Sequence, residues 1–182
     1  MKHLIILFCL LSQLCLAQSS VKNLAKKLGP DPLYFIDSVK ISKDDLKNLD
    51  AKTICSLTVL TDTDATNKFG PNARDGVVLL VTKAQAKRNY IRFFRRKSTH
   101  YDSLMNKMKS DSTFQYIIND KIKIDGNNSE GDLAAINDDL FISLEILSAD
   151  DLKNKYSIID KSVGVLIRCR KPKNFSHVDE RF

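Results

Sequence analysis

An internal repeat constrains the fold of this chain more than any other feature of its sequence. The segment Leu46–Gly70 aligns without gaps with Leu133–Ser157. Because such a repeat normally encodes the same supersecondary unit twice, we expect two similar units in tandem. The residue pairs that are identical in this alignment are Leu46 and Leu133, Ser56 and Ser143, Leu57 and Leu144, Leu60 and Leu147, Asp64 and Asp151, Asn67 and Asn154, and Lys68 and Lys155.

The first unit contains three apolar runs between Pro32 and Lys83. Leu33–Ile36 stops at turn-forming residues, Ile54–Leu60 alternates between apolar and polar side chains, and Val77–Val81 is rich in β-branched residues. Short runs of these kinds are typical of β-strands. We therefore expect three strands in this unit.

Two short helices are expected between these strands. Ser42 and Thr61 are suitable N-caps, and acidic residues follow each of them, where the helix dipole favours negative charge. Asp45 stands where a capping box prefers Glu or Gln. Gly70-Pro71 is a helix stop signal. The order strand–helix–strand–helix–strand follows.

The second copy carries the same strand pattern. Phe114–Asn119 corresponds to the first strand, and Val163–Cys169 corresponds to the third. We place the first unit at 32–83, a helical connector at 84–112 and the second unit at 113–171.

The second strand has the same polar face in both copies. In the first copy, Ser56 and Thr58 lie on that face, opposite Leu57. In the second copy, Ser143 and Glu145 occupy it. Both copies are therefore expected to bury the same side. The predicted fold class is α+β, with two tandem βαβαβ units that have mixed sheets and short helices.

One family shares the pattern of the first copy. The segment resembles the plug domain of TonB-dependent outer-membrane receptors, in the version common in nutrient-uptake receptors of Bacteroidetes. The resemblance implies two plug-like units; at this length we expect no transmembrane barrel beside them. The family usually has Gly where Ser38 stands. The elements that carry the resemblance are Pro32–Asp37, Ser56–Leu60, Asp64–Thr66, Phe69-Gly70 and Asp75-Gly76-Val77-Val78.

The N-terminus has the pattern of a secretory signal. Residues 1–17 combine Lys2, an apolar stretch and a small residue at Ala17. We expect cleavage before Gln18 and an exported protein, periplasmic or secreted, with outer-membrane association left open. A lipoprotein anchor is the alternative, but Leu14 precedes Cys15, where a small residue is needed.

The remaining terminal segments are polar. Residues 18–31 carry Val21, Leu24, Ala25 and Leu28 at helical spacing, which fits either a short amphipathic helix or a frayed end. The charged segment 172–182 lacks periodicity and is expected to be a flexible tail. No further segment is long and apolar enough to span a membrane.

The most basic segment is Lys87–Lys97, in a chain whose net charge is +7. Arginine with interleaved aromatic residues can bind an acidic partner or a phosphorylated one. The alternative is an amphipathic helix whose aromatic residues enter the core and whose arginines face water. Export makes nucleic acid a poor partner. The candidate contact residues are Arg88, Arg92, Arg95, Arg96 and Lys97.

Two cysteines remain after signal cleavage, Cys55 and Cys169. An oxidising compartment permits a disulfide between them. Both lie in apolar strand patterns, which favours the alternative that they are core cysteines.

No catalytic or metal-binding motif stands out. His100 and His177 have no Cys or Glu at ligand spacing, and Asp125–Asp132 departs from the EF-hand pattern, so a solvated loop is expected there. The pairs Asp44-Asp45 and Asp138-Asp139 are explained by capping. We expect no cofactor and no metal.

These features favour a non-enzymatic plug-like module that binds a protein partner in the cell envelope. The alternative is an accessory subunit that docks to a separate outer-membrane uptake or envelope-signalling complex. An enzyme without known motifs is a third hypothesis, which a cleft with convergent titratable groups would favour.

Overall fold

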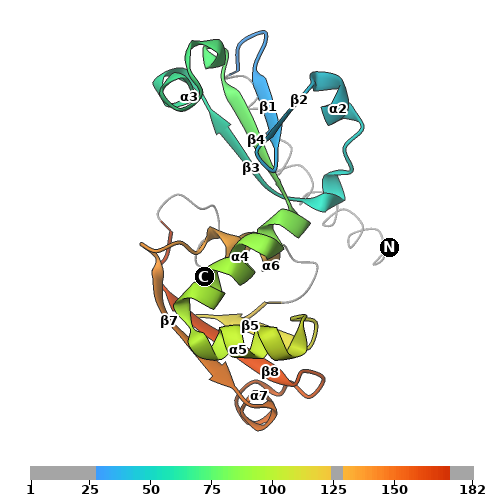
Figure 1. Cartoon of the computed structure of the whole chain (residues 1–182), viewed down its shortest axis with the longest axis vertical. Coiled ribbons are helices and arrows are strands. Elements are labelled where there is room, and N and C mark those ends of the chain that lie inside the picture. Colours follow the sequence, from blue (N-terminus) through green and yellow to red (C-terminus); the bar gives the residue numbers. More distant parts are fainter. Residues whose placement is uncertain (1–27, 124–128, 173–182) are drawn as a thin grey trace, which may run out of the picture. The chain divides into compact units, whose positions relative to one another are not determined.

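The protein is described here from a computed structural model, which covers residues 28–123 and 129–172 (Figure 1). The chain divides into two compact units, Met1–Val81 and Thr82–Phe182. The expected signal at 1–17, most of the segment 18–31 and most of the tail at 172–182 lie outside the described residues.

The first unit is built on a four-stranded sheet in the order β2-β1-β4-β3. Strand β1 pairs in parallel with β4 and antiparallel with β2. The elements are β1 (Leu33–Ile36), β2 (Val39–Ile41), α2 (Lys43–Lys47), η1 (Ala51–Thr53), β3 (Ile54–Leu60), α3 (Asp62–Phe69), η2 (Pro71–Ala73) and β4 (Val77–Thr82).

The second unit contains a sheet of the same order, β6-β5-β8-β7, with two additional helices before it in the chain. Strand β5 again pairs in parallel with its long neighbour β8, and β7 pairs with β8 antiparallel. The elements are α4 (Lys83–Lys97), α5 (Thr99–Met108), β5 (Phe114–Ile118), β6 (Lys121–Ile122), α6 (Ser129–Ala135), β7 (Phe141–Leu147), α7 (Ala149–Tyr156) and β8 (Val163–Cys169). The α+β class and the two tandem units are thus confirmed.

The sequence alignment and the observed elements agree in register. Strands β3 and β7 occupy the same alignment positions, and so do helices α3 and α7. The strand pairing gives a second check, because Tyr34 lies opposite Val78 in one sheet and Tyr116 lies opposite Val165 in the other. Both pairs are equivalent in the two copies, so the repeat is structural.

Each sheet also carries a short edge strand that we did not expect from the sequence. A two-residue turn leads into it, at Asp37-Ser38 in the first unit and at Asn119-Asp120 in the second. All four turn residues have positive φ, with 72° at Ser38. Positive φ at both central positions is what a type I′ hairpin turn requires, and it favours Gly. Ser38 therefore adopts a backbone conformation that glycine would adopt at lower cost.

One helix–strand contact differs between the copies in a complementary way. In the first unit, Val77 of β4 packs in one cluster with the small Ala65 of α3. At the equivalent positions the second unit has Gly164 in β8 and Leu152 in α7. A Cβ atom at Gly164 would lie 2.7 Å from Leu152 Cδ2. In the first unit the larger side chain of this contact is on the strand, and in the second unit it is on the helix.

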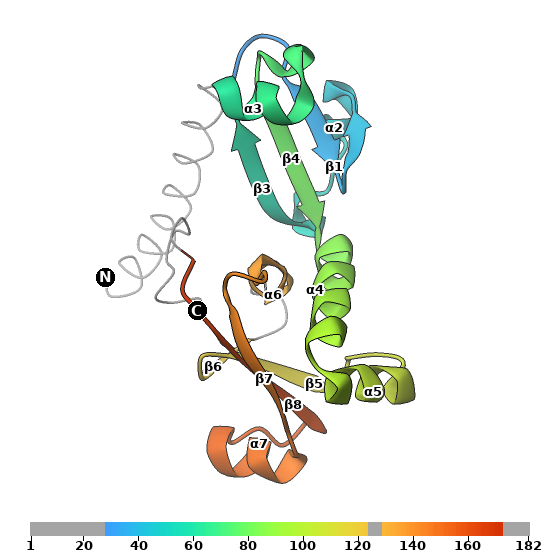
Figure 2. The ribbon, with the colours of Figure 1, turned by 60° about the vertical axis from the view of Figure 1, so that its left-hand side comes forward.

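The cores lie on the faces of these sheets. In the second unit, α4, α5 and α6 cover the face of β5 and β8 that carries Tyr116, Val165 and Ile167, while α7 covers the opposite face through Leu152 (Figure 2). In the first unit, α3 covers the sheet through Ala65 and Phe69. The expected burial of Leu57 is wrong, because this residue of the edge strand β3 is 44% exposed.

Helix caps agree with the sequence in most places. Ser42 forms a capping box with Asp45, and Ser148 forms the same box with Asp151. Thr61 precedes α3 but makes no side-chain cap hydrogen bond. Gly70 ends α3 with φ of 80°, as a stop residue should.

Candidate functional site

Helix α4 positions the basic segment and belongs to the compact second unit. Thr82 caps it, because its hydroxyl oxygen accepts a hydrogen bond from the Gln85 backbone N–H at 3.1 Å. Tyr90, Phe93 and Phe94 point into the core and are buried. The expectation that the aromatic residues of this helix enter the core is confirmed.

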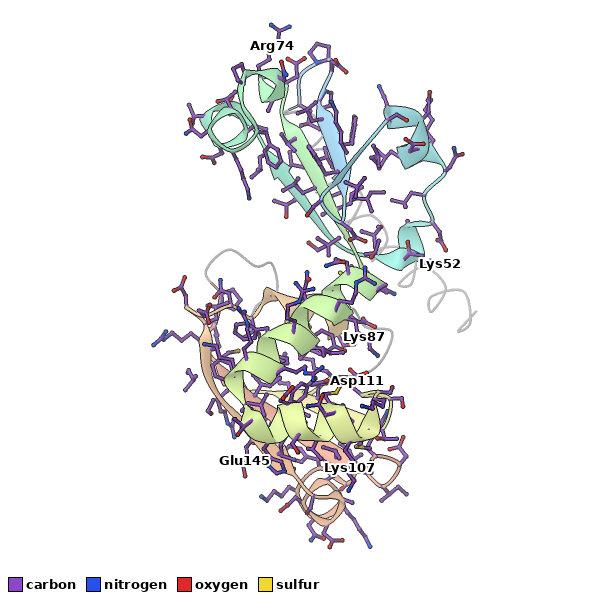
Figure 3. The ribbon with its side chains drawn as sticks, viewed as in Figure 1. Lys52, Arg74, Lys87, Lys107, Asp111 and Glu145 are labelled. Carbon is purple, nitrogen blue, oxygen red and sulfur yellow. The ribbon has the colours of Figure 1, made fainter. Side chains whose placement is uncertain are left out.

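The buried carboxylate of Asp111 connects α4 to the sheet. Asp111 accepts hydrogen bonds at Oδ2 from the Tyr90 hydroxyl at 2.8 Å and from the Tyr116 hydroxyl at 3.1 Å. Lys87 Nζ lies 2.6 Å from its Oδ1, with both residues labelled in Figure 3. The Tyr116 hydroxyl also lies 2.7 Å from the Tyr101 hydroxyl of α5. The network thus joins α4, α5 and β5.

The electrostatics of this network follow from burial and hydrogen bonding. Burial alone would raise the pKa of Asp111, but hydrogen bonds from Lys87, Tyr90 and Tyr116 and the charge of Lys87 lower it below its ordinary value. Burial raises the pKa of both Tyr90 and Tyr116. Asp111 is therefore charged, and the tyrosines are neutral donors, across the physiological range.

The structure separates the five basic candidate residues into two groups. Three of them form ion pairs or hydrogen bonds with side chains of their own unit. Arg95 Nε lies 2.5 Å from Asp102 Oδ1, Arg88 donates two hydrogen bonds to Gln85, and Lys97 Nζ lies 2.6 Å from Asp138. For the other two, Arg92 and Arg96, no ion pair is found within residues 28–123 and 129–172.

Arg92 and Arg96 line a groove on the second unit. They stand one helical turn apart on α4, so their side chains lie on the same face. The groove has a volume of about 330 Å³, at the lower end of ligand pockets. Its lining comes from α4 and from the end of α6 with the residues that follow it: Asn89, Tyr90, Arg92, Phe93, Arg96, Ala134, Ile136, Asn137 and Asp138.

A cluster of charged and aromatic side chains surrounds Phe93, one of the residues that line the groove. Lys97 Nζ lies 5.5 Å from the ring centres of both Phe93 and Phe141, and the Arg96 guanidinium lies 5.8 Å from the Phe93 ring. The hydrogen bond from Lys97 and the nearby positive charges of Lys97 and Arg96 lower the pKa of Asp138. Cation–π contacts of this kind favour these positions of the Arg96 and Lys97 side chains.

A second, smaller cavity lies beside the Asp111 network. Its volume is about 70 Å³, which is room for about two water molecules. Glu130 Oε2 is buried there without a hydrogen-bond partner in the described part of the chain. Lys123 and Asp132 form a buried ion pair at 3.1 Å next to it. The predicted solvated loop at Asp125–Asp132 is thus wrong for its second half, because Ser129–Asp132 belongs to α6.

Each of the two cysteines lies in a strand of its own unit. Cys55 lies half-buried in β3, where its thiol is 3.4 Å from the Val81 carbonyl oxygen. Cys169 is buried in β8 beside Asn119, and burial raises the pKa of its thiol. The expectation of a core cysteine holds for Cys169, which belongs to a buried cluster, and only in part for the half-buried Cys55.

Residues 28–123 and 129–172 offer few side chains for other kinds of site. His100 is exposed, and His177 lies outside these residues. No group of three or more His, Cys, Asp or Glu side chains that could hold a metal ion occurs within the two described ranges. In the same ranges, no helix is both long and apolar enough to cross a bilayer.

Sequence reasoning missed three residues of the site. Asn89 precedes Arg92 by one helical turn, so helical spacing could have found it. Asn137 reaches the groove from the end of α6, and Asp111 comes from the α5–β5 connection. Nothing in the local sequence of those two residues indicates where they meet α4.

Compared with protein-family models, with curated proteins and with solved structures, the chain shows no significant match.

Proposed function

We propose that this chain is an exported, non-enzymatic binding module of the cell envelope, and that it contacts a protein partner through the groove beside α4. The main observation behind this proposal is the composition of the groove. It combines two arginines that have no ion pair in the described part of the chain with apolar side chains from α4 and from the end of α6. Arginine and aromatic residues are enriched among the anchor residues of protein interfaces.

The envelope location is supported by the secretory pattern of residues 1–17. The plug-like sequence pattern of the first unit supports an origin shared with receptor plugs, and the sheet order common to both units extends this proposal to the second unit. In this proposal the chain has no transport activity of its own. The first unit shares the sheet but not α4 and α5, so we assign the partner contact to the second.

Site-specific photo-crosslinking tests this function. A photoreactive residue replaces Asn89 in the groove, and in a control variant it replaces the exposed Lys107 of α5, labelled in Figure 3. We expect one defined protein adduct from position 89 in the cells that produce the chain, and none from position 107. An adduct from both positions, or from 107 alone, would refute the groove as the contact surface.

The same experiment separates the two envelope roles. An adduct with an outer-membrane uptake or signalling protein identifies the chain as an accessory subunit of that complex. An adduct with a periplasmic protein identifies a stand-alone binding module.

A further inference from the structure

The groove presents hydrogen-bond donors whose acceptors are not found in the described residues. The guanidinium groups of Arg92 and Arg96 have several N–H donors each and no acceptor capacity. The oxygen of Asn89 is occupied, because it accepts from Gln85 Nε2 at 2.8 Å. The oxygen of Asn137 accepts from the Leu140 backbone N–H at 3.1 Å. Both side chains are thereby left with their N–H groups to offer.

The groove has little acceptor capacity of its own. Asp138 is the acidic residue that lines it, and Lys97 Nζ lies 2.6 Å from its Oδ1. Its carboxylate therefore already has a partner. A ligand that fits must supply acceptor oxygens and negative charge.

The floor adds a second requirement. Phe93, Ile136 and Ala134 contribute apolar surface, and the first two are almost fully buried. An apolar group of a ligand that packs on this floor is itself removed from water, which stabilises a complex. The ligand should therefore combine acceptor oxygens with an apolar side chain.

We propose that the groove binds an extended acidic segment of a protein partner, in which carboxylate side chains flank an apolar side chain. Arg92 and Arg96 bind the carboxylates, because guanidinium groups match carboxylate geometry. The amides of Asn89 and Asn137 donate to backbone carbonyl oxygens of the segment, and its apolar side chain packs on Phe93 and Ile136. This inference rests on the proposed function and specifies the chemistry of the partner.

The same features disfavour an anionic membrane surface. Recognition of anionic headgroups normally uses clusters of four or more basic residues near the membrane. Here Arg88 and Arg95 are committed to Gln85 and to Asp102, which leaves two arginines at the groove. Amide donors above an apolar floor suit a peptide backbone better than a headgroup.

Peptide binding to the mature full-length chain tests the inference. The probes are fluorescein-labelled peptides with a repeated Glu-Leu-Glu, Gln-Leu-Gln or Lys-Leu-Lys segment, followed by fluorescence anisotropy. We expect the Glu peptide to bind at least about tenfold more tightly than the Gln peptide, since charge-assisted hydrogen bonds are the stronger ones. Arg92→Ala with Arg96→Ala should lose about tenfold or more, while the control Arg88→Ala should bind as wild type.

A charge reversal sharpens the test. Arg92→Glu with Arg96→Glu should abolish binding of the Glu peptide and create binding of the Lys peptide. Both arginines are exposed, so these variants should keep the wild-type circular dichroism spectrum.

Two results would overturn the inference. One is equal binding of the Glu and Gln peptides. The other is binding to phosphatidylserine vesicles that the double alanine variant loses while peptide binding stays unchanged. If the Glu peptide does not bind but position 89 still gives a protein crosslink, the acidic segment is rejected and the proposed function stands. If the Glu peptide binds in the groove but protein crosslinks form only from positions outside it, the proposed function is rejected and the peptide specificity of the groove stands.

Discussion

Exchanging the residues at one helix–strand contact tests whether the two units are copies of one design. Gly164→Val should overpack the second unit, because a Cβ there already meets Leu152 Cδ2 at 2.7 Å and Leu147 Cβ at 2.8 Å. Overpacking of this kind costs about 1–3 kcal/mol. Leu152→Ala should cost about 3 kcal/mol, because Leu152 is 0% exposed and its removal leaves a cavity.

The two changes together recreate the Val77–Ala65 arrangement of the first unit, where Leu60 takes the place of Leu147. Valine at position 164 then fills the space that Leu152 leaves. We expect the double variant to be at least about 2 kcal/mol more stable than the sum of the single effects, within the range of coupling between contacting residues.

Urea denaturation followed by near-ultraviolet circular dichroism measures these free energies. The signal reports mainly on the second unit, because four of the five tyrosines lie there: Tyr90, Tyr101, Tyr116 and Tyr156. As a control, Gly164→Val with Leu133→Ala should be additive, because Leu133 lies in the cluster on the other face of the sheet. Additivity of Gly164→Val and Leu152→Ala within about 0.5 kcal/mol would refute the reasoning.

Three further predictions follow from single contacts. Asp111→Asn should destabilise the second unit by about 2–4 kcal/mol at pH 7, since the amide has no negative charge for Lys87 and keeps one acceptor oxygen where the buried carboxylate has two. Because the pKa of Asp111 is lowered from 3.8, its contribution to the free energy of unfolding is present above about pH 4 and is lost as the pH falls through the pKa of the folded state. In urea titrations, the free energy of unfolding of the variant should therefore decrease less at acidic pH than that of the wild type. Ser38→Gly should stabilise the first unit by about 0.5–1 kcal/mol in thermal unfolding, because φ is 72° there; an unchanged or lower Tm would contradict this. Ser148→Ala should cost about 1 kcal/mol through loss of the capping box of α7, whereas the exposed Ser103→Ala should cost little in the same assay.

The elements that the sequence predicted well are those with strong local signals. The alternation in Ile54–Leu60 and the stop at Gly70 define β3 and α3, and the repeat carries both to β7 and α7. The edge strand β2 was missed because Asp37-Ser38 looks like the end of a strand. Without the glycine that normally marks a type I′ turn, the hairpin has no clear local signal.

The site was predictable only in part, for a physical reason. The periodicity of Lys87–Lys97 is a local property, so it shows which residues of α4 face outward. Asp102 and Asn106 from α5 engage Arg95, and Asp138 from the segment after α6 engages Lys97. Those contacts arise from tertiary packing, and no pattern within the helix encodes them.

The most direct test of the central claim is a nuclear magnetic resonance titration of the full mature chain with the Glu-Leu-Glu peptide. The signals to follow are the Nε–H groups of Arg92 and Arg96 and the side-chain amides of Asn89 and Asn137. We predict that these four shift most, and that Arg88 and the first unit change little. Larger shifts in the first unit, or at Arg88 rather than Arg92, would contradict the assignment of the groove as the binding surface.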